Sequence, residues 1–261
     1  MMLSTDPQQD GVPMLKTPVR PHKDLPEFYA RPEVRTEFVT HLFDGTAQYY
    51  DRVSAALSFG TCRAYRKMAL RRAGLEPHMR MLDVATGTGL VAQAALDLGL
   101  PPGRMAGVDP SRGMLEENRK RRSIQLVQGQ GERLPFAECS FDFISMGYAL
   151  RHVEDLGALF GEFHRVLRPG GRVLVLEISR PESRLIRSLA RFYLARLLPV
   201  LARWFTGNRE VGRLLEFYWA TIDECVPPPT ILSALGESGF VQVERRRMYG
   251  MLSDYFAMKK A

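Results

Sequence analysis

Residues 81 to 179 alternate short apolar segments with helical patterns, and this alternation restricts the chain to few folds. The helical segments are GLVAQAALDLGL, SRGMLEENRKR with Ser111 as its cap, and 155–167. Strands that alternate with helices form a parallel sheet covered by helices on both faces, which predicts an α/β, Rossmann-like fold. Such sheets bind ligands at the carboxyl ends of their strands. The expected strands are 81–85, 104–109, 124–129, 141–147 and 172–179.

The segment LDVATGTG (82–89) joins the first strand to the first of these helices and is a candidate cofactor loop. Gly87 allows a tight turn, and Gly89 lets the backbone approach a ligand closely. Asp109, at the end of the next strand, can accept hydrogen bonds from both hydroxyls of a ribose. With Ala92 the glycines also satisfy the dinucleotide fingerprint G-x-G-x-x-G/A. The loop alone therefore leaves open hydride transfer from a nicotinamide and methyl transfer from S-adenosylmethionine (SAM).

Three features favour SAM. Asp83 lies within the strand before the loop, where a carboxylate favours the ammonium and sulfonium groups of SAM and gains nothing from a pyrophosphate. No further segment resembles a separate catalytic domain for hydride transfer. The segment GERLPF, which starts at Gly131, follows the third strand and places Glu132 where an adenine would lie.

The flanking segments predict one domain with helical additions. Apolar residues recur at helical spacing in 33–74, a helical arm, and in 184–224, a helical lid inserted after the fifth strand. The end of the chain indicates two strands around Gly250, a hairpin. Prolines and polar residues near the start of the chain predict a disordered leader over 1–32, followed by a single domain over 33–261.

The chain resembles the class I SAM-dependent methyltransferases, and within them the ubiquinone/menaquinone biosynthesis C-methyltransferases (the UbiE-like family). The resemblance implies a seven-stranded, mostly parallel sheet with one antiparallel strand. It also implies a C-methylation of a phenolic or quinol ring, with a prenylated quinone precursor as a candidate acceptor. The matching segments are FDGTAQYYDRVSAALSFG (43–60), LDVATGTG (82–89), GVDPSRGML (107–115), GERLPFAECSFDFIS (131–145), YALRHVEDL (148–156), HRVLRPGGRVLVLEISRP (164–181) and CVPPPTILSALGESGF (225–240).

The same resemblance assigns the cofactor contacts. Asp83, Gly87 and Gly89 hold the methionine part of SAM, and Asp109 holds the ribose. Near the adenine, the family often has Asp or Asn where this chain has Gln130, followed by Gly131 and Glu132. Met114 is expected either under the adenine or in the core. Tyr50, from the Y-D pair of the arm, closes over SAM and touches the substrate.

The segment YALRH carries the expected catalysis. Arg151 matches an arginine that the family uses to activate the substrate, and a permanently charged guanidinium would stabilise a phenolate. At the next position the family usually has Asn, and here there is His152, which can take up a phenolic proton near neutral pH. The alternative for His152 is a solvent-facing residue that caps the following helix.

The substrate stays open at this point. O- or N-methylation of a secondary metabolite on the same scaffold is one alternative. A SAM-dependent amino transfer of the rhodoquinone type is another, and a silent SAM-fold subunit of a quinone-biosynthesis complex is a third.

The formal charge of +7 is concentrated in 184–213, where arginines alternate with large apolar residues. This segment is interpreted as a lid over the pocket or as a basic amphipathic surface that associates transiently with an anionic membrane, and both can hold together. Charges interrupt it too often for a membrane span, and the interleaved aliphatics argue against nucleic acid. The scattered cysteines lack zinc spacing, so no metal is expected and the cytoplasm, with the inner membrane face, is the expected location. A homodimer is a further expectation.

Overall fold

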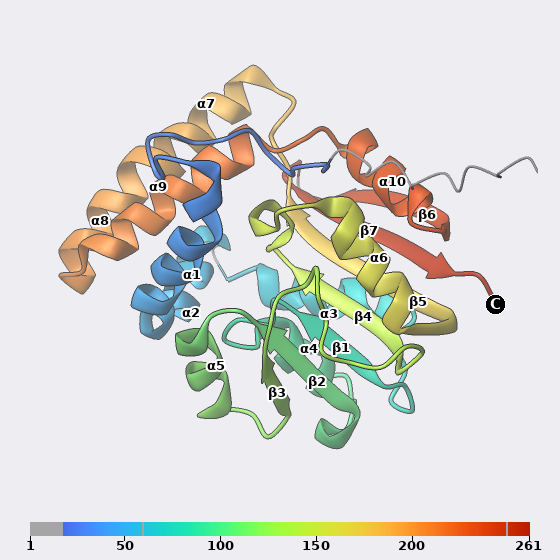
Figure 1. The fold of residues 1–261 in the computed structure, drawn as a ribbon. Coiled ribbons are helices and arrows are strands. Elements are labelled where there is room, and N and C mark those ends of the chain that lie inside the picture. The colour runs from blue at the N-terminus through green and yellow to red at the C-terminus, as the bar shows by residue number, and fades with distance from the viewer. Residues whose placement is uncertain (1–17, 59, 249) are drawn as a thin grey trace, which may run out of the picture.

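The computed structural model describes residues 18–58, 60–248 and 250–261, and the described strands form a seven-stranded sheet in the order β3-β2-β1-β4-β5-β7-β6 (Figure 1). Neighbours among β1 to β5 pair in parallel, and β7 pairs antiparallel with both β5 and β6. The predicted mixed sheet with one antiparallel strand is therefore confirmed. The strands are β1 (Met81–Val84), β2 (Met105–Asp109), β3 (Gln125–Gln128), β4 (Phe141–Gly147), β5 (Leu167–Ile178), β6 (Phe240–Met248) and β7 (Leu252–Lys259).

Helices cover both faces of this sheet and produce two apolar cores. On one face, α6 and α10 pack onto the strands with residues such as Leu159 and Ile231. On the other face, α3 and α4 contribute residues such as Leu70 and Ala95. These helices are α3 (Cys62–Arg72), α4 (Leu90–Leu96), α5 (Arg112–Arg119), α6 (Leu156–Val166) and α10 (Pro228–Glu237), with short turns η3 (Pro102–Arg104) and η4 (Leu150–His152).

The predicted arm (33–74) forms helices but divides in two: α3 covers the sheet. The part before α3, which we call the arm from here on, packs against the helical insertion near the carboxyl ends of the strands (Figure 1). Their shared core includes Val39 and Leu42 from the arm with Leu214 and Phe217 from the insertion. The arm contains η1 (Pro32–Val34), α1 (Arg35–Thr46), η2 (Ala47–Tyr49) and α2 (Tyr50–Ser58). The insertion contains α7 (Arg184–Phe192), the π-helical turn η5 (Tyr193–Leu197), α8 (Leu198–Thr206) and α9 (Arg209–Asp223).

Residues 18–32 differ from the expected disordered leader, whereas residues 1–17 lie outside the described part of the chain. The backbone N–H of Val19 donates to the carboxylate of Asp155 (2.9 Å), and Val226 donates to the carbonyl of Pro21 (2.8 Å). The side chains of Leu25 and Tyr29 are buried in the core shared by arm and insertion. Proline-rich composition suggested disorder, but these distant partners hold the segment on the domain.

No helix in the described ranges is long and apolar enough to cross a membrane.

Candidate functional site

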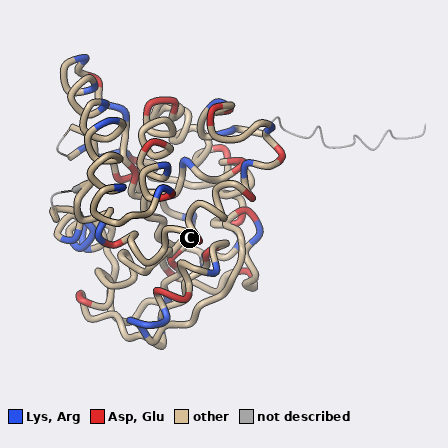
Figure 2. The backbone as a smooth tube through the Cα atoms, turned by 90° about the vertical axis from the view of Figure 1, so that its left-hand side faces the viewer, with Lys and Arg blue, Asp and Glu red and all other residues tan. Residues whose placement is uncertain are grey.

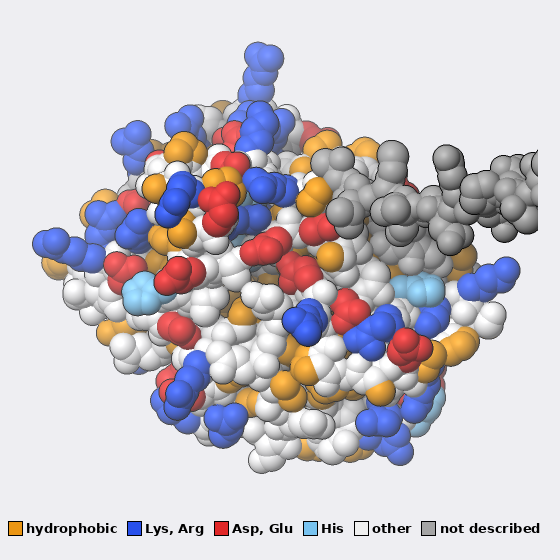
Figure 3. Space-filling model, in the orientation of Figure 1, with side chains coloured by type: hydrophobic (Ala, Val, Ile, Leu, Met, Phe, Trp, Pro, Cys, Tyr) orange, Lys and Arg blue, Asp and Glu red, His pale blue; other side chains and the backbone are white. Residues whose placement is uncertain are grey.

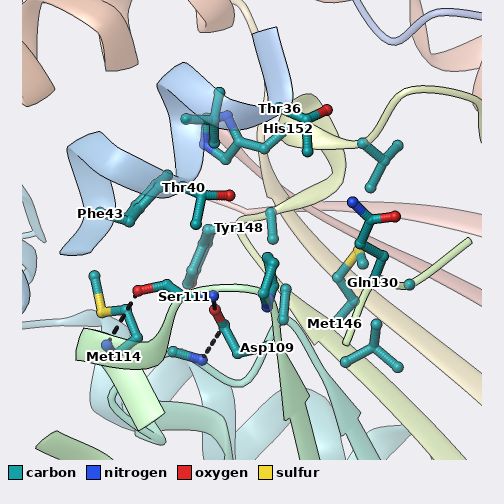
Figure 4. Close-up of a pocket in the computed structure, with 18 of the residues that line it drawn as sticks. Thr36, Thr40, Phe43, Asp109, Ser111, Met114, Gln130, Met146, Tyr148 and His152 are labelled. Atoms are coloured by element: carbon teal, nitrogen blue, oxygen red, sulfur yellow. Dashed lines mark hydrogen bonds between the residues drawn. The ribbon is translucent and has the colours of Figure 1, made fainter. Parts of the chain in front are cut away.

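A cleft lies at the carboxyl edge of the sheet, between the loops after β1, β2, β3 and β4 and the arm helix α1 (Figure 4). We call it the sheet-edge cleft. Parallel strands bring these loops to one edge, so segments distant in sequence meet there. Of the residues predicted to bind the cofactor, those that line the cleft are Tyr50, Gly87, Asp109, Met114, Gln130, Gly131 and Glu132.

Asp109 is the carboxylate at the floor of the sheet-edge cleft. One of its oxygens accepts from the backbone N–H of Gly87 (2.7 Å), and the other accepts from that of Ser111 (2.9 Å). Burial raises the pKa of Asp109 to about 6, although both hydrogen bonds oppose that shift. A carboxylate has about four acceptor sites, so two remain for a ligand with adjacent hydroxyls. The geometry therefore fits the ribose expected from the sequence.

The two glycines of the loop have different roles. Gly87 (φ +54°) lines the cleft, and a Cβ added there would enter open space. Gly89 (φ +85°) does not line it, and an added Cβ would lie 2.6 Å from the Asn118 side chain. Asn118 in turn donates to the carbonyl of Gly87 (3.2 Å). The prediction that Gly89 approaches the ligand is therefore not supported, because its missing Cβ makes room for the residue that holds the loop.

Asp83 also lies behind the cleft rather than in its wall. Its carboxylate is buried and accepts hydrogen bonds from Ser145 (2.5 Å) and Thr86 (2.7 Å). Burial raises the pKa of Asp83 to about 6, while the two hydroxyl donors lower it. Asp83 was predicted to contact the methionine part of the cofactor directly. In the structure its carboxylate instead holds Thr86, at the start of the glycine loop.

The residues predicted to contact the adenine line the cleft on two of its sides. Figure 4 shows Gln130 on the side opposite Met114, with Met146 beneath it. Glu132 accepts a hydrogen bond from the backbone N–H of Glu154 (2.7 Å), and burial raises the pKa of Glu132. Met114 is buried and also lines the cleft, which fits its predicted place in the core; a position under the adenine stays a prediction.

Two acidic residues tie the arm to the cofactor loops. Asp44 accepts hydrogen bonds from the hydroxyl of Ser111 (2.6 Å) and from the backbone N–H of Gly113 (2.8 Å). Asp51, the partner of Tyr50 in the Y-D pair, accepts from the hydroxyl of Thr88 (2.6 Å) and forms an ion pair with Arg121. The arm is therefore positioned directly by the motifs it covers.

A second cavity, which we call the lid cavity, lies between the arm and the insertion. Its volume is about 390 Å³. Tyr50 and Tyr148 belong to the walls of both cavities, so they form the partition between them. The hydroxyl of Tyr50 shares a hydrogen bond with that of Tyr218, another lid-cavity residue. Apolar residues make up much of the remaining wall: Leu57, Ile178, Ala190, Leu194, Ile222, Met251 and Leu252.

Arg151 lies in the wall of the lid cavity. It forms an ion pair with Glu177, and the side chains of both residues are only 1% exposed. Its Nε donates to the hydroxyl of Thr221 (3.3 Å), and its backbone carbonyl accepts from Arg35 of the arm (2.9 Å). The second oxygen of Glu177 has no partner among the described residues. Arg151 is thus a buried cation beside an apolar chamber, held from three sides.

His152 lies in the other cavity, although it is the next residue. It lines the sheet-edge cleft, where its ring stacks on Phe217 and meets Phe43 edge-on (centroid distances 5.5 and 5.2 Å). Burial lowers the pKa of His152 well below 6.5, and the nearby charge of Arg151 adds to this. The imidazole is therefore neutral and a weak base. The alternative capping role is wrong, because Asp155 caps α6.

Two residues of these walls were missed from the sequence. Tyr148 begins the segment YALRH without a predicted role of its own, and its left-handed backbone (φ +61°) turns its ring into the partition. Arg66 lines the lid cavity, and its buried Nε has no partner among the described residues. Its guanidinium lies 5.2 Å from the centroid of the Tyr148 ring. Its helical spacing in α3 gave no sign of a distant chamber.

Comparison with known proteins adds to this geometry. The chain is 33% identical over 223 residues to the demethylmenaquinone methyltransferase of Symbiobacterium thermophilum. The aligned region covers 82% of this chain and 88% of that protein. It is 30% identical over 230 residues to the ubiquinone/menaquinone biosynthesis C-methyltransferase UbiE of Desulfotalea psychrophila, with coverage of 85% and 90%.

Solved structures agree on the fold. A SAM-dependent methyltransferase from Thermotoga maritima matches with a TM-score of 0.60 at 21% identity, over 84% of this chain and 99% of that chain. Phosphoethanolamine N-methyltransferase 2 of Haemonchus contortus, in complex with SAM, matches with a TM-score of 0.56 at 16% identity, over 76% and 53%. The model of the ubiE/COQ5 methyltransferase family matches residues 31–259, so the chain belongs to that family and is a SAM-dependent methyltransferase.

Proposed function

We propose that this protein transfers the methyl group of SAM to a ring carbon of a quinol that carries an isoprenoid tail. The observation that carries the proposal is the lid cavity, an apolar chamber that contains Arg151 and adjoins the sheet-edge cleft through Tyr50 and Tyr148. Two chambers with a common partition suit a donor and an acceptor that must meet at one point. The names of the relatives, demethylmenaquinone methyltransferase and UbiE, support the same acceptor class.

The sheet-edge cleft is proposed as the SAM site. Asp109 has acceptor sites left for the ribose hydroxyls, and the open space at Gly87 admits the ligand beside the loop. Gln130, Gly131 and Glu132 would surround the adenine, with Met114 packed against it. Asp83 and Gly89 would act from behind, by fixing the loop. When bound, SAM supplies an electrophilic methyl group.

Arg151 is the residue proposed to activate the ring. A phenolate places electron density on the ring carbons beside its oxygen, and a guanidinium stabilises that phenolate in a chamber that excludes water. Glu177 orients Arg151 from the side away from the cavity. The transfer replaces a ring hydrogen with a methyl group and releases one proton.

Arg66 gives the lid cavity a second cation. A quinol ring has two oxygens on opposite sides, and the guanidinium of Arg66, a cavity-lining residue, would donate to the one that Arg151 does not bind. Tyr50 would hold the ring at the partition. His152 is proposed as a neutral wall residue beside SAM and not as the base, because its pKa lies well below that of a phenol.

The apolar wall of the lid cavity supports a prenylated acceptor, and such an acceptor partitions into lipid. We therefore propose a protein that works in the cytoplasm at the inner face of the membrane, without a membrane span of its own.

The test is to identify the acceptor atom. Purified protein is incubated with SAM carrying a ¹³C methyl group and with a demethylmenaquinol kept reduced, and the product is examined by ¹³C NMR. The expected label is on a ring carbon. Label on an oxygen or nitrogen, or a new ring amine without label, would replace this proposal with one of the other SAM-dependent reactions. Absence of any product with several quinols, despite SAM binding, would also reject it.

A further inference from the structure

The helices α7, η5 and α8 form one continuous helical stretch, residues 184–206, with two apolar faces. The inner face lines the lid cavity through Ala190, Tyr193 and Leu194. The outer face carries large apolar side chains that are at least 60% exposed. We call this the outer lid face, and its residues are Leu185, Leu189, Phe192, Val200, Trp204 and Phe205.

The exposure of the outer lid face is unusual for a protein in water. Trp204 and Phe205 are 78% and 75% exposed, and their rings contact each other at 5.0 Å between centroids. Elsewhere in the described ranges the exposed large apolar residues are single ones, such as Met68 and Val241. A contiguous apolar surface of this kind indicates a binding surface.

The charge of this stretch identifies the partner. Residues 184–206 contain five arginines and no Asp or Glu. Arg187 and Arg203 form ion pairs with residues of α9, whereas no ion pair involves Arg184, Arg191 or Arg196 among the described residues. Figure 3 shows hydrophobic and Lys/Arg side chains interspersed on the side where Figure 1 places α7 and α8. Figure 2 shows both signs of charge along most of the remaining backbone.

The absence of Asp and Glu from residues 184–206 argues against a second copy of this chain. Two copies that met through the outer lid face would bring arginines against arginines, which is destabilising in a contact that excludes water. A bilayer with anionic headgroups can bind both the arginines and the apolar side chains of this surface. The arginines pair with phosphates, and the aromatic and aliphatic side chains enter the boundary of the acyl region.

We propose that the outer lid face docks on the surface of an anionic bilayer. Docking there places the wall of the lid cavity against the lipid, since the same helical stretch supplies Tyr193 and Leu194 to that wall. An acceptor dissolved in the lipid would then reach the lid cavity directly. That delivery rests on the function proposed above. The docking itself does not depend on it.

The test measures binding to vesicles without substrate. The full-length protein is sedimented with phosphatidylcholine vesicles and with vesicles that contain phosphatidylglycerol. We expect binding to the anionic vesicles that falls at least about tenfold in Trp204→Ser/Phe205→Ser, because two aromatic side chains no longer enter the bilayer. Arg191→Gln/Arg196→Gln should lose about tenfold on anionic vesicles and little on neutral ones.

Matched control variants remove apolar side chains and arginines at exposed positions outside the outer lid face. Met68→Ser/Val241→Ser and Arg71→Gln/Arg119→Gln, all at exposed positions, should bind like the unchanged protein. Circular dichroism and thermal unfolding check that each variant is folded. Equal binding of all variants to both vesicle types would overturn the proposal. A dimer in sedimentation velocity that Trp204→Ser/Phe205→Ser dissociates would overturn it in favour of a second copy.

Methylation assays keep the two proposals separate. With a short-tailed acceptor in solution, the outer-face variants should turn over as fast as the unchanged protein, whereas a long-tailed acceptor embedded in anionic vesicles should be methylated about tenfold more slowly. Vesicle binding without C-methylation rejects the proposed function alone. C-methylation with no vesicle binding rejects the docking alone.

Discussion

The sheet-edge cleft and the lid cavity share two tyrosines but are built in different ways. The cleft is built mostly from loops that each follow a strand directly, and most of its wall comes from residues 84–154. The wall of the lid cavity comes from residues as far apart as Tyr50 and Leu252, on the arm, the insertion and the last strand. The first cavity is thus encoded by local motifs, and the second by tertiary packing. Substitutions in each should therefore affect different steps.

The largest expected effect separates the two cavities at Arg151. Arg151→Ala should lower turnover about 10²–10³-fold, since a phenolate loses its buried cation, and leave SAM affinity within about twofold of its normal value. It should also lower the free energy of unfolding by about 3–5 kcal/mol, because Glu177 loses its buried partner. Single-turnover kinetics, calorimetry with SAM and denaturant unfolding measure the three quantities.

Arg151→Lys is the companion variant, since it keeps the charge beside Glu177. It should recover most of the stability but only part of the turnover, because a lysine lacks the planar pair of donors. If SAM affinity and turnover fall together in both variants, Arg151 serves the sheet-edge cleft and the division of labour is wrong.

Within the cleft, the two glycines should respond differently. Gly89→Ala should lower the free energy of unfolding by about 2–4 kcal/mol, from its left-handed backbone and its contact with Asn118. Gly87→Ala should lower it by only about 1–2 kcal/mol and should weaken SAM binding. Urea unfolding and calorimetry measure both. Partial recovery of stability in Gly89→Ala/Asn118→Ala supports the packing role, and weaker SAM binding in a fully stable Gly89→Ala would contradict it.

Asp109 should make SAM binding depend on pH. As the pH falls below about 6 the carboxyl takes up a proton, and SAM affinity should decrease about tenfold per pH unit. Asp109→Asn should weaken binding at pH 7.5 about 10–100-fold, through the loss of charge-assisted bonds, and should flatten the profile. Calorimetry from pH 5 to 8 measures both effects. If SAM affinity depends on pH in the variant as it does in the unchanged protein, Asp109 is not the residue that binds the ribose.

The stability of the free protein should change with pH in the opposite sense. The pKa of Asp109 is raised from 3.8 to about 6 on folding, so the native state binds more protons than the unfolded state between these values. The stability contributed by this carboxyl is therefore complete below pH of about 4 and is lost as the pH rises through about 6. The stabilisation by SAM grows over the same window.

The smallest expected effect concerns Arg66. Arg66→Met should raise the KM for a quinol about fivefold, because one hydrogen bond to a quinol oxygen is lost. The kcat and the SAM affinity should change little. The matched comparison uses an acceptor with one free ring hydroxyl, for which the variant and the unchanged protein should differ less. Equal losses for both acceptors would show that Arg66 only supports Tyr148.

The sequence predicted the sheet well because its signals are local. The strand-helix alternation, the Ser111 cap and the final hairpin each depend on residues close together in the chain. The packing of residues 18–32 was not predictable in this way, since its partners, such as Asp155 and Val226, are more than 100 residues away.

The residues of the two cavities show the same difference between local and distant signals. Asp109 and Gly87 line the cleft because Asp109 ends β2 and Gly87 lies in the loop after β1, both at the carboxyl edge of the sheet. The separation of Arg151 from His152 was not predictable from a motif. They lie in the 3₁₀ turn η4, where successive side chains diverge by about 120°. Only the tertiary structure shows that this divergence leads into two different cavities.

The shared tyrosines have a thermodynamic consequence. Because Tyr50 and Tyr148 each face both ligand chambers, a ligand that fixes either ring in one chamber reshapes the other. Linkage then requires reciprocity: whatever factor SAM imparts to the dissociation constant of the acceptor, the acceptor imparts to that of SAM. The demethylated coproduct, which lacks the sulfonium charge, need not impart the same factor, and that difference would govern the order in which products leave.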